Sequence, residues 1–288
     1  MPVSSLLAVL LAAVLHAVWH LLSKRARDAS AFMWWGITVG AIWYGLVLGS
    51  NRSLALPAQV WAIYVLSIGA EIASVALVAA GYRFGDLSQV YPIARGTPPL
   101  MIALWSAIFL GERLPVAGYL GVAALMVGVY LCSLPSPRDV LRPVAALGNR
   151  PAQLAMLAAV CVSVYSVLDK SAVALVDPLV YNFWVYFGIS IGYAAFVWTG
   201  PRRARTLSEW RTNWRWVLAG SLATVGSYML ALIVMSTAPA SYVGAVRATS
   251  VLIGALMGWL ALRETFGIMR VAAAGVIAVG LVAIAIAT

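Results

Sequence analysis

The feature that most constrains this chain is a succession of ten apolar stretches. Each is long enough for an α-helix to cross the roughly 30 Å hydrocarbon core of a bilayer, which takes about 20 residues. The predicted spans are 3–23, 29–49, 59–82, 87–110, 115–133, 152–171, 178–199, 214–236, 240–262 and 267–287. With their short loops they occupy the whole chain. The sequence therefore predicts an all-α integral membrane protein without a soluble domain.

Composition excludes an ordinary soluble core. The chain is 63% hydrophobic and 10% charged, whereas soluble domains average about 45–50% and about 25%. The net charge of +10 comes from arginines in short loops between the spans, so it indicates membrane topology and not nucleic-acid binding. We expect the lipid bilayer as the surroundings and no nucleic acid as a partner.

The basic residues are distributed unevenly between the two sets of loops. The loops after the odd-numbered spans hold fourteen of them: Lys24, Arg25, Arg27, Arg83, Arg138, Arg142, Arg150, Arg202, Arg203, Arg205, Arg211, Arg215, Arg263 and Arg270. The opposite loops hold Arg52, Arg113 and Lys170. The positive-inside rule then predicts a multi-pass protein with both termini on the non-cytoplasmic side.

The two halves of the chain repeat each other. At an offset of 152, "YPIARGTPPLMIALWSAIFLGERL" aligns with "VGAVRATSVLIGALMGWLALRETF", so that Arg95 meets Arg247 and Glu112 meets Glu264. Charged residues in register within apolar sequence indicate a duplication. We expect a first repeat over 1–135, a cytoplasmic linker over 136–150 and a second repeat over 151–288. Because five spans are an odd number, the repeats must be inverted, with the substrate site in a central cavity between them.

The start of the fourth span has two interpretations. Pro92, Gly96, Pro98 and Pro99 can break the helix and leave Arg95 beside a gap that lines the cavity. Alternatively, the span begins near residue 97, with a proline in its first turn and the arginine at the headgroups. The second half lacks these prolines, so we expect the kink in the first half only.

These motifs resemble the EamA-type branch of the drug/metabolite transporter superfamily. The resemblance rests on three features of each half. They are an Ala-Arg or Val-Arg at the start of the fourth span, the motif that ends this span ("LGERLP" or "LRETFG"), and the glycine-rich span that follows. The resemblance implies a ten-helix secondary transporter of the cell (inner) membrane that exports small metabolites. We expect it to work by alternating access. Within the branch the chain is most similar to exporters of amino acids, including aromatic ones. Exporters of drugs or nucleosides, and a channel-like facilitator, remain alternatives.

Three titratable residues inside spans are candidates for proton coupling. Glu71 lies near the middle of its span, where a carboxylate is costly and is by default a functional candidate. His16 and His20 lie one helical turn apart, and histidine titrates near neutral pH. The alternatives are a structural carboxyl paired with an arginine, and histidines that hydrogen-bond neighbouring helices.

Aromatic and basic residues complete the candidate site. Trp19, Tyr91, Tyr165 and Tyr242 form an aromatic box if they face the cavity, or anchor the interfaces if they do not. Arg95 and Arg247 can bind a carboxylate by paired hydrogen bonds. The predicted substrate-binding residues are His16, Trp19, Glu71, Tyr91, Arg95, Tyr165, Tyr242 and Arg247. Together they suit an amphoteric small molecule.

An enzyme is not expected. In "HAVWH" Ala17 occupies the place where an intramembrane zinc protease carries its general base. We predict no catalytic residue, metal or cofactor.

Small residues and acidic turn residues predict how the helices pack. Small residues four apart, such as Ala117 with Gly121, Ala124 with Gly128 and Ala274 with Ala278, predict close helix packing. We favour an internal seam and a monomer, and leave a homodimer open. Glu112 and Glu264 are predicted to cap the helix that follows each of them.

Overall fold

The computed structural model describes residues 2–49, 53–84, 93–94, 96–134, 136–141, 148–262 and 267–287. The regular structure in these ranges is helical. The first half contains α1 (Val3–Arg25), α2 (Ala29–Leu48), α3 (Ala58–Phe84), α5 (Pro98–Phe109), α6 (Val116–Cys132) and the short 3₁₀ helix η2 (Pro137–Asp139). The second half contains α8 (Arg150–Val173), α9 (Pro178–Val197), α10 (Arg202–Thr237), α11 (Ala240–Ala248), α12 (Ser250–Leu262) and α13 (Ile268–Ile286).

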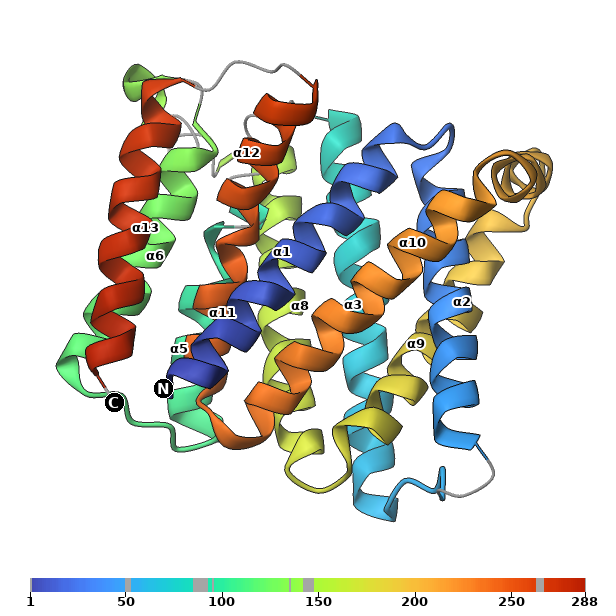
Figure 1. Cartoon of the computed structure of the whole chain (residues 1–288), viewed down its shortest axis with the longest axis horizontal. Coiled ribbons are helices and arrows are strands. Elements are labelled where there is room, and N and C mark those ends of the chain that lie inside the picture. The colour runs from blue at the N-terminus through green and yellow to red at the C-terminus, as the bar shows by residue number, and fades with distance from the viewer. Residues whose placement is uncertain are drawn as a thin grey trace.

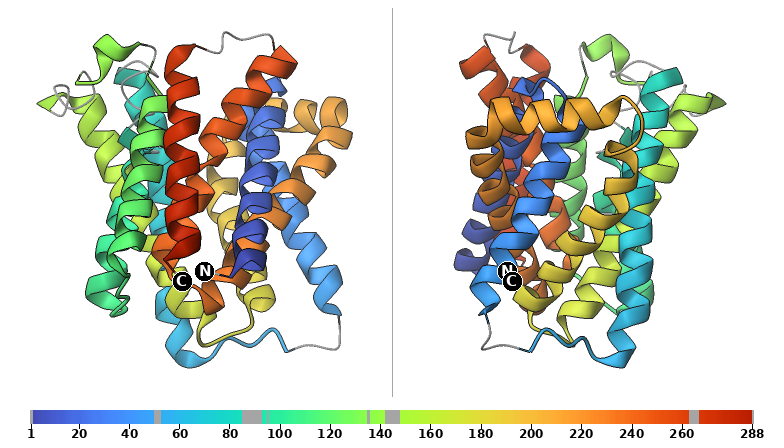
Figure 2. Two further views of the ribbon diagram at one scale, coloured as in Figure 1. Left: turned by 60° about the vertical axis from the view of Figure 1, so that its left-hand side comes forward. Right: turned by 90° about the vertical axis from the view of Figure 1, so that its right-hand side faces the viewer.

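The ten predicted spans are confirmed as helices. In the described residues, eight helical segments are long and apolar enough to cross a membrane, and α5 and α6 are shorter apolar helices at the fourth and fifth spans. The two chain termini lie at the same end of the bundle (Figures 1 and 2), as an even number of crossings requires. Which side of the membrane this end faces stays a prediction.

The two halves interlock through equivalent helix pairs. The first span of each half packs chiefly against the third span of the other, because α1 lies on α10 and α3 lies on α8. The second spans, α2 and α9, pack together, and the fifth spans, α6 and α13, do the same. This reciprocal pairing is what a twofold relation between inverted repeats produces, and it confirms the inverted-repeat membrane fold.

The fourth span is broken at the same aligned position in both halves. In the first half α5 begins at Pro98, and Thr97 is its N-cap residue. Residues 93, 94 and 96 are helical as well, and the Thr97 amide donates to the Ile93 carbonyl at 3.3 Å. The span is therefore broken at Thr97, as the first interpretation predicts, and does not begin there; the place of Arg95 beside the gap stays a prediction. In the second half α11 ends at Ala248 and α12 begins at Ser250, with Thr249 between them. The expectation of a break in the first half only was wrong: Thr249 breaks the helix without proline, and its hydroxyl bonds to the Val246 carbonyl at 2.7 Å.

The helix α10 is longer than a membrane span. Its residue Asn213 has non-helical backbone angles (φ −120°, ψ 16°), so the helix bends there. The segment 202–212 lies across one end of the bundle, end-on in Figure 1 and side-on in the right panel of Figure 2. The segment 214–237 then forms the eighth span. We call residues 202–216 the α10 elbow.

Small residues let α6 and α13 approach each other closely, within this one chain. A Cβ atom on Gly128 would lie 2.5 Å from Ile277 and 3.1 Å from the Ala273 carbonyl oxygen. The α13 face of this seam therefore includes Ala273, Ile277 and Gly280, which are buried. The predicted pair Ala274 and Ala278 is not this face, since Ala278 is exposed. The predicted internal seam is confirmed, with its register on α13 corrected by one residue.

Two glycines of α13 test this seam. A Cβ on Gly280 would lie 2.8 Å from the backbone nitrogen of Leu125 and 2.9 Å from the carbonyl oxygen of Gly121, and backbone cannot move aside cheaply. Gly280→Ala should therefore lower the free energy of unfolding by about 1–3 kcal/mol. Gly275→Ala, on the same helix with no atom within 4 Å, should be neutral or add up to about 1 kcal/mol. Unfolding by SDS in mixed micelles measures both, and equal effects would contradict the seam.

Candidate functional site

A buried carboxylate on α8 organises the polar interior. Asp169 is 1% exposed. Its Oδ1 accepts hydrogen bonds from the hydroxyls of Ser67 at 2.5 Å and Tyr181 at 2.6 Å, and its Oδ2 accepts one from Tyr228. These donors come from α3, α9 and α10. Four helices from both repeats therefore converge on one carboxylate, whose oxygens are satisfied by hydroxyl donors.

Two further charges lie beside this carboxylate. Glu71 is one helical turn after Ser67 on α3, and it interacts electrostatically with Asp169 and with Arg247 of α11. The guanidinium carbon of Arg247 lies 4.9 Å from the centre of the Tyr228 ring, as in a cation–π contact. Asp169, through its bond to the Tyr228 hydroxyl, thus holds the ring on which Arg247 rests.

The charged atoms of Glu71 and Arg247 are not fully paired within the described residues. Glu71 Oε2 and Arg247 Nε are both buried and have no hydrogen-bond partner there. Burying such atoms unsatisfied costs about 1–3 kcal/mol each, more when they are charged. A carboxylate and a guanidinium held close together with free bonding capacity can receive a ligand that carries both charges.

A second layer of hydroxyl groups lies next to these charges on α2 and α9. The Asn182 amide donates to the Tyr44 hydroxyl at 2.5 Å, and that hydroxyl donates to the Val225 carbonyl at 3.0 Å. The hydroxyls of Tyr186 and Thr224 lie 3.1 Å apart, and Tyr186 interacts electrostatically with both Arg247 and Glu71. Fixed hydroxyl groups therefore continue from the charges toward α2.

Of the predicted site residues, Glu71, Tyr165 and Arg247 come together. Tyr165 lies one helical turn before Asp169 on α8 and interacts electrostatically with Tyr228. His16 and His20 contact each other on α1: their Nε2 atoms are 3.1 Å apart and their rings pack edge to face. Their predicted coupling role stays a prediction.

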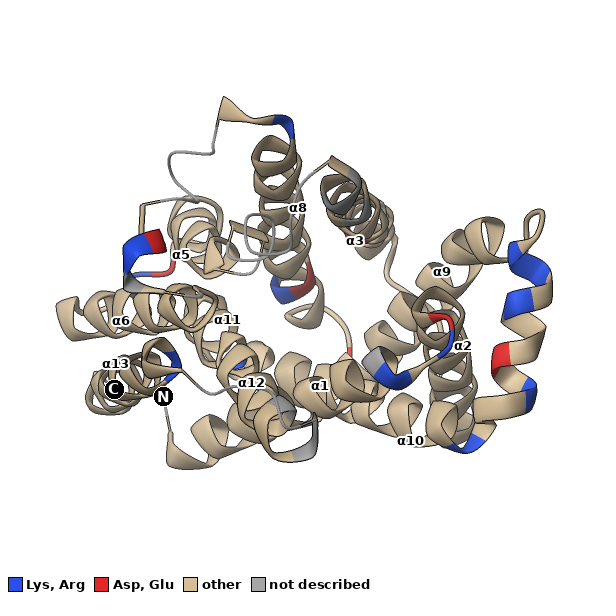
Figure 3. Cartoon of the chain, turned by 90° about the horizontal axis from the view of Figure 1, so that it is seen from above, with Lys and Arg blue, Asp and Glu red and all other residues tan. Residues whose placement is uncertain are grey.

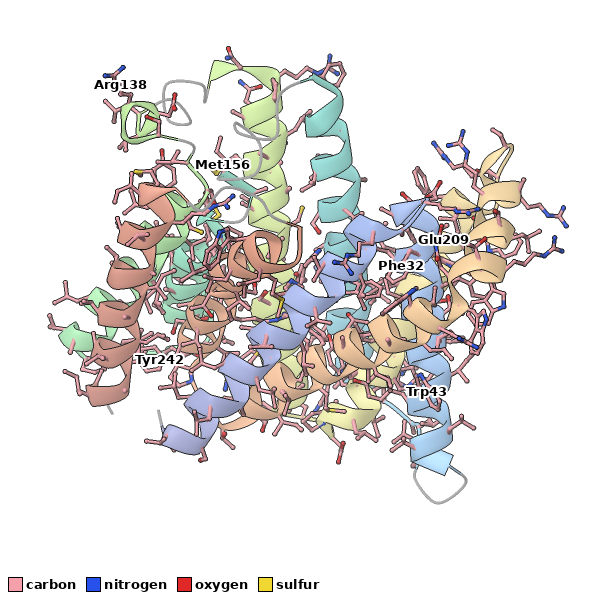
Figure 4. All side chains as sticks on the ribbon, turned by 45° about the horizontal axis from the view of Figure 1, so that its top comes forward. Phe32, Trp43, Arg138, Met156, Glu209 and Tyr242 are labelled. Carbon is pink, nitrogen blue, oxygen red and sulfur yellow. The ribbon has the colours of Figure 1, made fainter. Side chains whose placement is uncertain are left out.

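Two predicted aromatic residues, Trp19 and Tyr242, lie far apart in the structure. The Trp19 ring is buried in a slot made by two glycines, Gly36 of α2 and Gly220 of α10, with Phe32 beside it. Tyr242 is buried against Gly118, where α11 meets α6. Figure 4 shows Phe32 and Tyr242 on opposite sides of the bundle, so Trp19 and Tyr242 do not line one box together. Tyr91 and Arg95 lie outside the described residues.

A second polar cluster clamps one end of the bundle. Glu112, in the turn after α5, accepts hydrogen bonds from the Ala240 amide at 2.8 Å and the Ser241 hydroxyl at 3.2 Å. The Lys170 ammonium, on α8, donates to the carbonyls of Met235 and, at 3.0 Å, Ala238. Glu112 and Lys170 also attract each other. We call this pair the α10–α11 clamp, because it holds the last turn of α10 and the first turn of α11.

The clamp corrects two predictions. Glu112 caps a helix as expected, but the helix is α11 of the other repeat and not the following helix α6. Lys170 is not a loop residue. It lies within α8, and its positive charge is stabilised by the negative C-terminal end of the α10 dipole. Both side chains act on backbone that is distant in sequence, which no local motif indicates. Glu264 lies outside the described residues.

The residue that sequence reasoning missed is Asp169. It is next to Lys170 near the end of a predicted span, so the sequence predicts that both charges lie at the membrane surface. The available signal was its position four residues after Tyr165 on the same helix face. Its hydroxyl donors are 102, 12 and 59 residues away in sequence, so the fold alone brings them together.

Removing the carboxylate should leave three hydroxyls without their acceptor. We expect Asp169→Ala to lower the free energy of unfolding by about 2–4 kcal/mol, and Ser67→Ala by about 1 kcal/mol. Tyr228→Phe should cost less in the Asp169→Ala background than in the parent, because its hydroxyl has already lost its acceptor. SDS unfolding in mixed micelles measures this double-mutant cycle, and strict additivity would contradict the network.

Comparisons with known proteins agree with this geometry. A solved chain described as "Crystal structure of protein" matches with a TM-score of 0.73 at 20% identity, covering 98% of this chain and 96% of its own. That likeness concerns the fold. No curated protein matches. The model of the EamA-like transporter family matches residues 3–134 and 150–286. The chain therefore belongs to the EamA-like transporter family, whose members are membrane transporters.

Proposed function

We propose that this chain is a secondary transporter that exports amino acids, aromatic ones among them, by alternating access. The observation that supports this proposal is the pair of Glu71 and Arg247 beside Asp169, each with a buried polar atom that no described residue satisfies. An amino acid carries the complementary charges. Its carboxylate can bind the guanidinium, and its ammonium can bind the carboxylate of Glu71.

The surrounding side chains suit an apolar or aromatic substituent. Tyr186 and Tyr228 lie within electrostatic range of Glu71, and Tyr165 lies near Tyr228. Tyrosine rings accept both ring stacking and an ammonium group on their faces. A nucleoside would use the same rings without needing the two opposite charges. The separated charges therefore favour amino acids over neutral amphipathic compounds.

The charge balance of the cluster supports proton coupling as the driving mechanism. Among the described residues it holds two carboxyl groups, Glu71 and Asp169, and one guanidinium, Arg247, since Lys170 is turned toward the α10 carbonyls. A buried carboxylate without a counter-charge is costly. A surplus carboxyl group of this kind can bind a proton or a cationic ligand. If a proton and a substrate ammonium compete for Glu71, the protein carries one of them in each direction, which is antiport.

The α10–α11 clamp supports alternating access over an open pore. It ties Glu112 of the first repeat and Lys170 of α8 to the turn between α10 and α11. The two helix ends must separate from Glu112 for a substrate to leave at that end. A carrier needs such a breakable contact, because ligands change the populations of two states that differ little in free energy. We infer that the clamp holds this end closed.

Transport by the purified chain in liposomes tests the substrate class. Counterflow of labelled phenylalanine, tyrosine or leucine should be accelerated by unlabelled amino acid on the opposite side, whereas a pore would show no acceleration. Arg247→Lys and Arg247→Gln should weaken apparent affinity for amino acids about tenfold or more, because the paired hydrogen bonds to the carboxylate are lost. Amino-acid amides, which lack the carboxylate, are the matched ligands and should respond little to the same changes.

The coupling role of Glu71 is separable in the same vesicles. Glu71→Gln should abolish uptake that is driven by a pH gradient. It should retain part of the exchange at equal pH, since the amide cannot carry the proton but can still accept a hydrogen bond. Full gradient-driven uptake in this variant would contradict proton coupling. Absence of amino-acid flux in the parent protein, with nucleoside flux present, would favour the second substrate class.

Weakening the clamp should open its end of the protein. Loss of a helix cap costs about 1 kcal/mol, which is about a fivefold change in the population of the open state. Nitroxide labels at Arg113→Cys and Thr237→Cys, in a background without Cys132 and Cys161, report the distance across the clamp by pulsed electron resonance. Glu112→Ala should enlarge the long-distance population, and Glu112→Gln should do so less. An unchanged distribution in both would make Glu112 a cap without a gating role.

A further inference from the structure

The α10 elbow carries a dense set of positive charges on an exposed surface. Four of its arginine side chains are exposed: Arg203, Arg205, Arg211 and Arg215. Arg202 is half-buried and stacks on Phe196, with its guanidinium carbon 3.9 Å from the ring centre. Figure 3 shows these basic segments gathered along one edge of the molecule. The positive-inside rule explains their side of the membrane, but a topology signal requires no such concentration.

The acidic residues near the elbow are occupied with backbone and amide groups. Glu209 is 1% exposed, and its two oxygens accept from the Asp28 amide at 3.0 Å and the Asn213 side chain at 2.6 Å. Asp28 Oδ1 accepts from the Ala31 amide at 3.0 Å, which caps α2. Neither carboxylate forms an ion pair with an elbow arginine in the described part of the chain. The guanidinium groups therefore remain available to an external anion.

The elbow is fixed to the bundle by specific contacts. Glu209 binds the backbone before α2, the Trp35 indole donates to the Thr206 carbonyl at 2.9 Å, and the Thr206 hydroxyl donates to the Val197 carbonyl at 3.0 Å. Figure 4 shows Glu209 on the inner side of this segment, above Phe32. A fixed helix presents its arginines at constant positions, so a ligand that binds them does not have to order the segment first.

Tryptophans mark the depth of the elbow in the bilayer. Trp210 of the elbow forms one contact cluster with Trp34, Trp35 and Trp198, in which the contacting ring centres are 4.6 to 6.3 Å apart. Trp214 and Trp216 at its bend are exposed. Tryptophan gathers at the boundary between hydrocarbon and headgroups. The arginines next to this cluster therefore lie at the level of the lipid phosphates.

We infer that the α10 elbow is a binding surface for anionic phospholipid headgroups. A guanidinium matches the oxygens of a phosphate diester with two parallel hydrogen bonds, and several such groups on one rigid helix can bind neighbouring headgroups together. The exposed Leu207 and the two exposed tryptophans can contact the ends of the acyl chains just below these headgroups. The exposed Arg25 and Arg27, before α2, extend the basic surface.

Lipid titration of the purified full-length chain in neutral detergent tests this surface. The thermal unfolding midpoint should rise with added phosphatidylglycerol, and the rise should shrink at high salt. Phosphatidylcholine and inorganic phosphate should each produce little change. Substituting Arg203→Gln, Arg205→Gln and Arg211→Gln together should weaken the apparent affinity for phosphatidylglycerol on the order of a hundredfold, about fivefold for each charge.

The matched control changes the same positions to lysine, which retains the charge but not the two parallel hydrogen bonds, so this variant should lose less affinity than the glutamine triple variant. The single change Arg113→Gln, at a distant turn, should retain all of it. Equal stabilisation by phosphatidylcholine, an unchanged response in the glutamine triple variant, or an equal response to inorganic phosphate would overturn the inference. Should the triple variant fail to fold, the single changes Arg203→Gln and Arg211→Gln carry the test, each with about a fivefold expected loss.

Discussion

The hydrogen bond from Ser67 to Asp169 joins the two repeats where α3 lies against α8. A carboxylate cannot remain charged inside a membrane protein without such donors, and its burial requires that both helices keep one register. That register places Glu71, one turn further along α3, beside the carboxylate. It also orients Tyr228, whose ring lies under Arg247. The charged interior thus depends on a contact that neither repeat can make alone.

The spans, the duplication and its inversion could be predicted because they follow from local patterns. Helix length is set by bilayer thickness, and an odd number of spans per repeat fixes the inversion. The polar contacts could not be predicted, since each joins residues from separate helices. Asp169 gave no sign of its hydroxyl donors, and the acceptor role of Glu112 toward α11 appears only when the repeats are placed together. Arg247 and Glu71 were found because a lone charge within an apolar span is costly wherever the chain folds.

The broken fourth spans show how the same geometry arises from different residues. In the first half Pro98 and Pro99 supply the break, and in the second half Thr249 does so with a side-chain hydrogen bond. The breaks nevertheless fall at aligned positions, Thr97 and Thr249. Proline is therefore one means of producing the break and not its reason. Because different residues produce the break at aligned positions, the fold itself requires it, with two half-helices that meet near the middle of the bundle.

That requirement connects the interior charges to the clamp. Arg247 lies two residues before the break in the second half, while Glu112 holds the first turn of the same short helix, α11. This nine-residue segment thus has a buried, partly unpaired guanidinium near one end and a cap from the other repeat at its first turn. A short rigid helix transmits displacement along its axis, because its internal hydrogen bonds change little when it moves. Under the proposed function, binding of a carboxylate at Arg247 would therefore change the strength of the cap, which is the physical coupling that an alternating-access carrier needs between its site and its gate.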